Sequence, residues 1–478
     1  MNRFAWLAAF AGLACAPLAS AQSTTDEIAK YRAALQDGNP AELWEARGEA
    51  LWKEKRGPKQ VSLEACDLGK GPGVVKGAYA ELPRYFADAD RVMDLETRLV
   101  WCMVRLQGYS DADAKKNPFG NGADKRSDLE ALTAYVTSES RGVKMSVALV
   151  HPKEVEAYRI GEKLFYFRGG THDFACATCH GENDKRIRLQ DLPNLMTTEG
   201  AQKAYTTWPA YRVSQGELRT FEWRLYDCFR QQRFPELVYG SDAAIALTTY
   251  LAHNANGGVY DGPAIKGELR TMNLRSRWVM FASATLVAAA CTTSPSDEEI
   301  SSKATATLKD SFKAAGQAGL DRLDQDDTQR ACSSLSGKTP PREIAAKIEA
   351  ANLATVKYPA DGKLLGDWKN GEKIAQEGRG KQFSDDPKGP VGANCYACHQ
   401  LSKSELSFGT IGPSLYQYGK SHGNSVEVQR YTYGKIFNSE AFIACSNMPR
   451  FGYKGILAEQ QIKDVTALLL DPASPVNQ

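Results

Sequence analysis

The sequence lacks a strong excess of charge of either sign, and it lacks an apolar run long enough to cross a membrane. Its 59 Lys and Arg residues against 57 Asp and Glu leave a formal net charge of +2, so composition gives no reason to expect nucleic acid as a partner. With 42% apolar and 24% charged residues, disordered, collagenous and multi-span membrane classes are excluded. At roughly 150 residues per domain, the 478 residues suggest about three soluble globular domains.

The N-terminus has the pattern of a secretory signal peptide. Residues 1–21 contain a positively charged start, an apolar stretch and a small-x-small cleavage site before Gln22. The protein is therefore expected to be exported.

A second segment of this kind, residues 272–290, lies inside the chain. It begins with a methionine and two arginines, but its apolar part of about 13 residues is shorter than the roughly 20 that a membrane-spanning helix needs. We interpret residues 1–271 and 272–478 as two gene products joined end to end; a natural fusion with an apolar linker is the alternative. The sequence before Cys291 resembles a lipoprotein cleavage site, and lipidation of this cysteine stays open, so a membrane is expected as a partner only if it is lipidated.

Each half of the chain contains one Cys-x-x-Cys-His pentapeptide. The two copies are Cys176-Ala177-Thr178-Cys179-His180 and Cys395-Tyr396-Ala397-Cys398-His399. In an exported protein this pattern is typical of haem c attachment, because the two thiols form thioethers with the haem and the adjacent histidine binds the iron. A zinc site would need two more soft ligands nearby, and a thioredoxin-like pair would not need the histidine. The sequence therefore predicts two covalently bound haem c groups.

The surroundings of the two motifs are alike. A Gly-Glu-Lys segment, at Gly161 and Gly371, opens a helical stretch before each motif. A proline follows the motif histidine by 13 residues in the first half and 14 in the second, at Pro193 and Pro413, where small cytochromes c pack a proline behind that histidine. Both halves are predicted to be class I cytochrome c domains.

A third, degenerate copy of the pattern lies near the start of the chain. Gly48 precedes Leu63 by 15 residues, the same offset as from Gly161 to Cys176. In the segment 63–67 the first cysteine is replaced by leucine and the histidine by Asp67, so no covalent haem is expected there; chance resemblance is the alternative. Each copy is expected to close with an amphipathic helix, over 129–135, 242–252 and 458–470.

We therefore expect a mainly α-helical protein with three class I cytochrome c-like domains, the first degenerate and without haem. After the signal peptide, the expected segments are a haem-free domain, a haem domain, a second signal peptide, an extension whose role the sequence does not reveal, and a second haem domain. Their boundaries are 22–150, 151–271, 272–290, 291–359 and 360–478.

Cysteine parity gives expectations for the remaining thiols. Cys66 and Cys102 are the favoured disulfide of the first half, closing a loop of about 35 residues and adding roughly 3–4 kcal/mol. Cys332 and Cys445 can pair in the second half if the cysteine beside the second signal is lipidated or removed. Cys228 is left over, and a disulfide to one of the other two first-half cysteines is the alternative.

The second iron ligand in a small cytochrome c comes from a loop before the last helix. Met448 lies 49 residues after the motif histidine of the second half, which predicts His/Met iron; His422 is the rival. In the first half the same offset, 48 residues, falls on Cys228. Met196 lies too early and His253 lies within the terminal helix. We therefore predict His180/Cys228 iron in the first half.

A thiolate ligand lowers the reduction potential relative to methionine, so electrons are expected to run from the first haem to the second. Arg224 lies four residues before Cys228 and shares its face if the stretch is helical. A guanidinium beside a sulfur ligand can hold a small oxyanion bidentately. For Arg230 and Arg233, pairing with haem propionates or Asp227 is the favoured interpretation.

These motifs together resemble a known family. The degenerate first copy, the first Cys-x-x-Cys-His and Arg224-x-x-x-Cys228 resemble the single-haem branch of SoxA. The second motif, with 411–415 reading Ile-Gly-Pro-Ser-Leu and 447–452 reading Asn-Met-Pro-Arg-Phe-Gly, resembles SoxX. The resemblance covers nearly the whole chain apart from the two signals and the extension.

The resemblance implies the periplasmic SoxAX cytochrome of bacterial sulfur oxidation, a heterodimer and L-cysteine S-thiosulfotransferase. Such an enzyme joins thiosulfate oxidatively to the cysteine thiol of a SoxYZ-type carrier protein and passes electrons to a soluble c-type cytochrome. It implies that Cys228 is a haem ligand found as a persulfide, and that Arg224 contacts substrate. Two alternatives remain open: a diheme thiosulfate dehydrogenase that makes tetrathionate, and a non-catalytic electron-transfer cytochrome.

Overall fold

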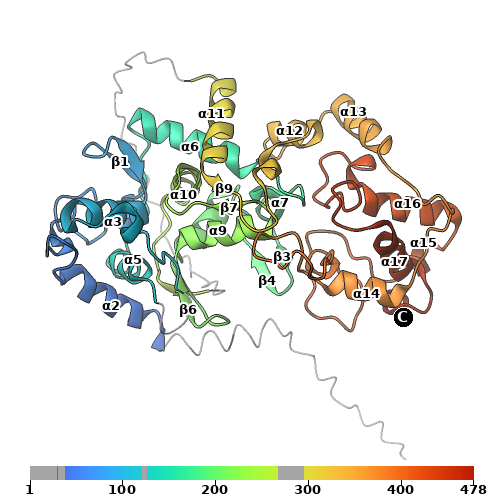
Figure 1. The fold of residues 1–478 in the computed structure, drawn as a ribbon, viewed down its shortest axis with the longest axis horizontal. Helices are drawn as coiled ribbons and strands as arrows, with labels where there is room; N and C mark the ends of the chain where they lie inside the picture. Colours follow the sequence, from blue (N-terminus) through green and yellow to red (C-terminus); the bar gives the residue numbers. More distant parts are fainter. Residues whose placement is uncertain (1–29, 31–37, 121–125, 267–294) are drawn as a thin grey trace, which may run out of the picture.

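The structure is a computed structural model. It describes residues 30, 38–120, 126–266 and 295–478. Both signal segments and Cys291 lie outside the described residues. Within the described part the protein is mainly α-helical with short strands, which confirms the predicted fold class (Figure 1). No helix in this part of the chain has the length and apolar character needed to cross a membrane.

The elements follow the order of the predicted segments. The first segment contains α2 (Glu42–Lys53), β1 (Arg84–Phe86), β2 (Arg91–Met93), α3 (Leu95–Cys102), α4 (Asp111–Ala114) and α5 (Asp128–Ser138). The second contains α6 (Pro152–Phe165), α7 (Cys176–His180), β3 (Lys185–Ile187), β4 (Gln190–Leu192), α8 (Thr198–Tyr205), β5 (Ala210–Arg212), β6 (Glu217–Arg219), α9 (Phe221–Gln231), β7 (Glu236–Leu237), α10 (Asp242–Asn254) and β8 (Ala264–Ile265). The extension contains α11 (Asp297–Asp310), β9 (Phe312–Lys313), α12 (Asp327–Ser334) and α13 (Arg342–Leu353). The last segment contains α14 (Trp368–Gln376), α15 (Tyr418–His422), α16 (Val426–Phe437) and α17 (Glu459–Leu470).

Three helix pairs, α2 with α5, α6 with α10 and α14 with α17, make the most extensive helix–helix contacts. One glycine of each pair, Gly48, Gly161 or Gly371, lies where the helices cross, and an added Cβ atom there would collide with a backbone carbonyl of the partner helix. Close approach of two helix backbones requires a residue without a side chain at that point. Each of the three predicted copies therefore contains the same kind of helix crossing. The three predicted closing helices are confirmed.

The position of these glycines within their helices differs from the prediction. Gly161 was expected to open a helix, but it lies in the last turns of α6, which begins at Pro152. The start is set by His151, whose ring accepts a hydrogen bond from the Lys153 N–H, and by Glu154, which accepts the His151 N–H. Gly48 and Gly371 likewise lie inside α2 and α14. The glycine marks the crossing, not the helix start.

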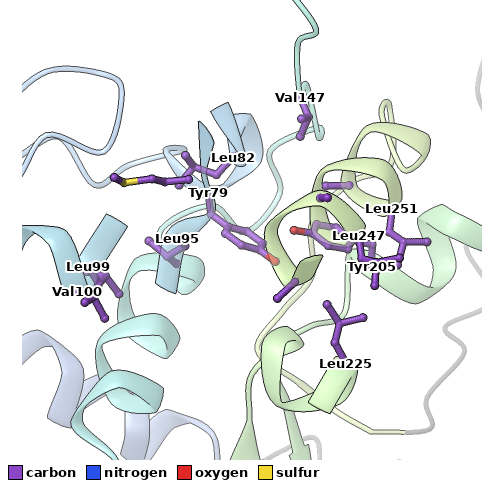
Figure 2. Close-up of a cluster of buried hydrophobic side chains, with 14 of the residues drawn as sticks. Tyr79, Leu82, Leu95, Leu99, Val100, Val147, Tyr205, Leu225, Leu247 and Leu251 are labelled. Atoms are coloured by element: carbon purple, nitrogen blue, oxygen red, sulfur yellow. The ribbon is translucent and has the colours of Figure 1, made fainter. Parts of the chain in front are cut away.

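The first two copies share one hydrophobic core, and the last copy has its own. The shared core contains buried residues from both, including Leu99, Leu132 and Leu247. Figure 2 shows Tyr79 of the first copy and Tyr205 of the second facing each other, and their rings stack with centroids 6.1 Å apart. The second core is built from residues 364–476.

The extension reaches back to the first half of the chain. Buried side chains of α11, Ile300, Ala304 and Leu308, belong to the shared core, and α11 packs on α6 and α10 (Figure 1). Strand β9 then pairs antiparallel with β7 through Phe312 and its neighbour. The phenyl ring of Phe312 contacts Phe229, with centroids 5.0 Å apart. This part of the chain thus joins the two halves non-covalently.

A buried ion pair also connects the halves. The Arg450 guanidinium, two residues after Met448, is 1% exposed and its Nε lies 2.8 Å from Asp173 Oδ2. Its second partner is Asp326, at 2.7 Å. Because a buried charge is costly without a partner, this network fixes the Met448 segment against the first half.

Candidate haem and thiol site

One large cavity, of about 1650 Å³, lies between the halves. It exceeds the roughly 300–1,000 Å³ of a pocket for one small ligand. The structure brings all predicted attachment, ligand and substrate-contacting residues to its wall. They are Cys176, Cys179, His180, Arg224, Cys228, Cys395, Cys398, His399 and Met448.

The two motif histidines are held in the same way. The Nδ1 of His180 lies 2.8 Å from the Pro193 carbonyl oxygen, and the Nδ1 of His399 lies 2.7 Å from that of Pro413. A carbonyl only accepts, so each Nδ1 carries the proton and each Nε2 is left to bind a metal. The predicted prolines therefore do lie behind the histidines. An added Cβ at Gly412 would collide with the His399 ring, which explains the glycine at that position.

Burial keeps these histidines neutral. It lowers the pKa of His180 to about 4 and also lowers the pKa of His399. A neutral imidazole is the form that binds iron. The two residues fit the role of haem ligand in charge, tautomer and orientation.

Five described cysteines are not in disulfides: the four thiols of the two motifs and Cys228. Burial is the main cause that raises the pKa of Cys179, Cys395 and Cys398 to about 12. Cys179 and Cys398 lie close enough for the charge of one to affect the other, and both line the cavity.

The structure contains the two predicted disulfides. Cys66 and Cys102 are bonded, as are Cys332 and Cys445. Both alternatives that would tie Cys228 into a disulfide with a first-half cysteine are thereby excluded. The sulfur of Cys228 is left facing the cavity.

Helix α9 carries Cys228 and Arg224 on one face, as predicted. The helix begins after Thr220, whose hydroxyl accepts the Trp223 N–H at 3.2 Å. Burial acts to lower the pKa of Arg224, but its interactions with the Cys228 sulfur and with Asp227 outweigh burial and raise that pKa. The guanidinium and the sulfur are therefore electrostatic neighbours.

Asp227 organises the cations around this face. Its carboxylate accepts hydrogen bonds from Arg224 at 3.3 Å and from Arg230 at 2.6 Å. Burial acts to raise the pKa of Asp227, but the surrounding arginines outweigh it and lower that pKa. The pairing favoured for Arg230 is confirmed. Arg233 instead donates to the carbonyls of Gly378 and Gly380 in the second half, so of its two expected partners Asp227 is not the one it binds, and pairing with a haem propionate stays a prediction.

Two cations of the site were missed by the sequence analysis. Arg212 in β5 and Lys266 after β8 line the cavity, brought together by the parallel pairing of these strands. Burial, with Arg224 and Arg212, lowers the pKa of Lys266 to about 7. The Nε and one terminal nitrogen of Arg212 are buried without a hydrogen-bond partner among the described residues. No local spacing signals this arrangement, because Lys266 reaches the site only through the β5–β8 contact.

The rival ligands lie elsewhere. His422 lies on exposed α15, where its Nδ1 contacts the Tyr418 carbonyl at 3.0 Å. His253 contacts the Val147 carbonyl at 2.8 Å, and Met196 is 43% exposed. Of the described residues that line the cavity, none is His422, His253 or Met196. Met448 lines it and packs against the second core.

The degenerate copy has a different interior. Asp67, at the position of the motif histidine, accepts hydrogen bonds from the backbone N–H groups of Gly69 and Gly71, at 2.7 and 3.0 Å. Leu63, at the position of the first motif cysteine, is 1% exposed. The residues lining the large cavity all fall between Phe165 and Leu469.

Comparison with known proteins identifies relatives of this chain. The SoxA/TsdA cytochrome c domain family matches residues 47–145 and 160–259. The L-cysteine S-thiosulfotransferase subunit SoxA of Hydrogenophilus thermoluteolus is 50% identical over 268 residues, covering 55% of this chain and 97% of the relative. An uncharacterized lipoprotein of Aquifex aeolicus (strain VF5) is 38% identical over 155 residues, 32% of this chain and 73% of the relative. Among solved structures, SoxXA from P. pantotrophus matches with a TM-score of 0.41 and 24% identity, covering 50% of this chain and 83% of that chain.

Proposed function

The chain belongs to the SoxA/TsdA family of cytochrome c proteins as a SoxA-type L-cysteine S-thiosulfotransferase, and we propose that it joins thiosulfate to the thiol of a SoxYZ-type carrier protein. The observation that carries this proposal is the unbonded sulfur of Cys228. It faces the same cavity as His180, with the Arg224 guanidinium beside it.

Cytochrome c domains imply covalently bound haem c, and we propose two such groups. Cys176, Cys179, His180 and Cys228 would hold the first; Cys395, Cys398, His399 and Met448 would hold the second. The cavity is larger than one small ligand requires, and both histidines leave Nε2 available. When bound, these groups would accept one electron at a time. A haem held by a thiolate would have a lower potential than one held by methionine, so electrons would run from the first to the second and on to a soluble cytochrome.

The chemistry of conjugation requires an anion site next to a sulfur. A carrier thiolate and thiosulfate, S₂O₃²⁻, combine to a carrier S-thiosulfonate; one S–S bond forms and two electrons leave. Bringing two anions together is unfavourable unless cations offset the repulsion. Arg224 and Arg212 supply this positive charge around Cys228, and Lys266 adds to it below its pKa of about 7. One terminal nitrogen of Arg212 lies 3.9 Å from the Asp227 carboxylate, and its buried Nε, which has no hydrogen-bond partner among the described residues, is a donor suited to an oxyanion.

Cys228 is the proposed point of sulfur transfer. Loss of two electrons would join the Cys228 sulfur to the terminal sulfur of thiosulfate, with Arg224 orienting the sulfonate end. Attack of the carrier thiolate on that terminal sulfur would then form the carrier S-thiosulfonate and release the Cys228 thiolate. Hydrolysis of the same adduct, with sulfate leaving, would leave Cys228 as a persulfide. The ion pair between Arg224 and Asp227 holds the guanidinium on the face of α9 that carries the sulfur.

The assembly follows from the two halves. We propose that residues 22–271 and 291–478 are the two subunits of a SoxAX-type heterodimer in the periplasm, with a haem-free first domain at 22–150 and haem domains at 151–271 and 360–478. The docked extension supports such an association, because α11 and β9 contact the first half directly. The lipoprotein among the relatives supports lipidation of Cys291, which would tether the complex to a membrane.

The test is Cys228→Ala in the full holoprotein. Thiosulfate conjugation to a carrier thiol is expected to be lost, while mass spectrometry still finds two attached haems, because neither motif is altered. Arg230→Gln, which removes a neighbouring cation turned toward Asp227, is the matched control and is expected to retain conjugation. Conjugation at the parent rate in Cys228→Ala would refute the proposal. Formation of tetrathionate without any carrier would instead identify a thiosulfate dehydrogenase.

A further inference from the structure

The β3–β4 hairpin of the first half docks on the haem-attachment loop of the second. The Arg188 N–H donates to the carbonyl oxygen of Ala397, inside the second motif, at 3.3 Å. Thr410 exchanges hydrogen bonds with the backbone of Arg186: its hydroxyl accepts the Arg186 N–H at 3.0 Å, and its own N–H donates to the Arg186 carbonyl at 2.9 Å. The hairpin follows the first motif directly, so it links the two attachment loops.

The side chain of Arg188 completes this contact. Its guanidinium donates to the side-chain oxygen of Asn394 at 2.6 Å, to the Gln376 carbonyl at 3.1 Å and to the Ser407 carbonyl at 3.1 Å. It also lies 5.9 Å from the centre of the Tyr396 ring. Arg188 is thus bound to the residue just before the second motif and contacts residues within it. Its own backbone is held at a φ of 51°, a left-handed conformation that this set of contacts must maintain.

All hydrogen-bond acceptors of this guanidinium are neutral. Within the described parts of the chain, no carboxylate lies within ion-pair distance of Arg188, whereas the nearby Arg379 is paired with Glu377 at 2.6 Å. The positive charge lies beside the second motif, because the guanidinium binds Asn394, the residue next to Cys395. A cation without a counter-charge acts more strongly on its surroundings than one that is paired.

We propose that Arg188 of the first half is a positioning residue for the second haem, which fixes the Cys395–His399 loop and raises the reduction potential of the haem attached there. The inference rests on the proposed function, in which the second half holds a His399/Met448 haem. Reduction adds an electron to the iron, and a fixed positive charge favours the reduced state. The first half would thereby set the potential of the group that takes its electrons.

The experiment uses the full holoprotein and three variants. Arg188→Gln removes the positive charge, and Arg188→Lys keeps the charge but loses the several N–H donors of the guanidinium. Arg379→Gln is the matched control, because it removes an exposed arginine that is paired with Glu377 near the same loop. The potential of each haem is measured by spectroelectrochemical titration, with haem content by mass spectrometry and methionine ligation by the sulfur-to-iron absorption band.

Arg188→Gln is expected to lower the potential of the second haem by about 59 mV, a tenfold change in its oxidised-to-reduced ratio. The potential of the first haem should stay near the parent value in all three variants. The potential of the second haem should stay near the parent value in Arg188→Lys and in Arg379→Gln. An equal shift in Arg188→Lys, or no shift in Arg188→Gln beyond that of Arg379→Gln, would overturn the inference. If Arg188→Gln loses the second haem, the potential of that haem in Arg188→Lys decides the question. A value near the parent supports the inference, and a value lowered by about 59 mV overturns it. A parent protein with no haem or no methionine ligation in its second half would instead refute the proposed function.

Discussion

The first and second copies of the cytochrome pattern share a helix crossing and a core but differ in their interior. Gly48 and Gly161 occupy equivalent crossing positions, and both copies match the same domain family. The second copy opens onto the large cavity through His180. In the first copy, Asp67 binds its own loop instead, and the buried Arg98 donates to the Asp67 carbonyl at 2.7 Å. The comparison teaches that the helix crossing persists without the attachment residues, provided that other contacts stabilise the loop.

The disulfide of the first copy gives the largest expected effect. Replacing both Cys66 and Cys102 by Ala removes a cross-link that spans 36 residues, which the chain-entropy estimate values at about 4 kcal/mol. The free energy of unfolding, measured with denaturant, should fall by that amount. Haem content should stay at two, because neither cysteine lies in a motif. Loss of a haem would contradict the division of roles between the two copies.

The crossing glycines give the next largest effect. Alanine favours a helix over glycine by about 1 kcal/mol, but a Cβ at Gly48 or Gly161 would collide with the partner backbone. Each substitution by Ala should therefore destabilise the protein, by roughly 2–3 kcal/mol as for an overpacked core.

Gly38→Ala is the control, because no atom lies within 4 Å of the added carbon. Thermal unfolding of the three variants checks the expectation. Unequal effects at Gly48 and Gly161 would show that the two crossings are not equivalent.

The last effect depends on pH and concerns the contact between the copies. Glu96 of α3 is buried beside Glu222, the second residue of α9, and accepts the Tyr239 hydroxyl at 3.0 Å. Burial, with Asp94, raises the pKa of Glu96 from 4.5 to about 8. The folded chain binds the proton of the Glu96 carboxyl more tightly than the unfolded chain does. The stability that this proton contributes is therefore fully present below about pH 4.5 and is lost as the pH rises through about 8.

Glu96→Gln keeps a neutral group at this site. At pH 8 the variant should be more stable than the parent by about 4 kcal/mol, and at pH 4 the two should be nearly equal. Denaturant unfolding at both pH values measures the difference. A gain of the same size at pH 4 would show that the carboxyl proton is not responsible.

The attachment site was largely predictable because its signals are local. The motif cysteines and histidines, the prolines behind them and the closing helices all depend on short spacings, and cysteine parity separated Cys228 from the disulfides. The helix starts were missed because the caps, such as His151, lie outside the repeated glycine segment. Arg212, Lys266, Arg188 and the docking of α11 were not predictable, because each depends on contacts between segments far apart in the chain.

The central proposal is that Cys228 and His180 would together hold the iron of the first haem. Low-temperature electron paramagnetic resonance of the oxidised holoprotein tests it most directly. The account predicts two low-spin signals, one of the His/thiolate type and one of the His/Met type, with only the first lost in Cys228→Ala. Identical spectra for the parent protein and Cys228→Ala would contradict the claim.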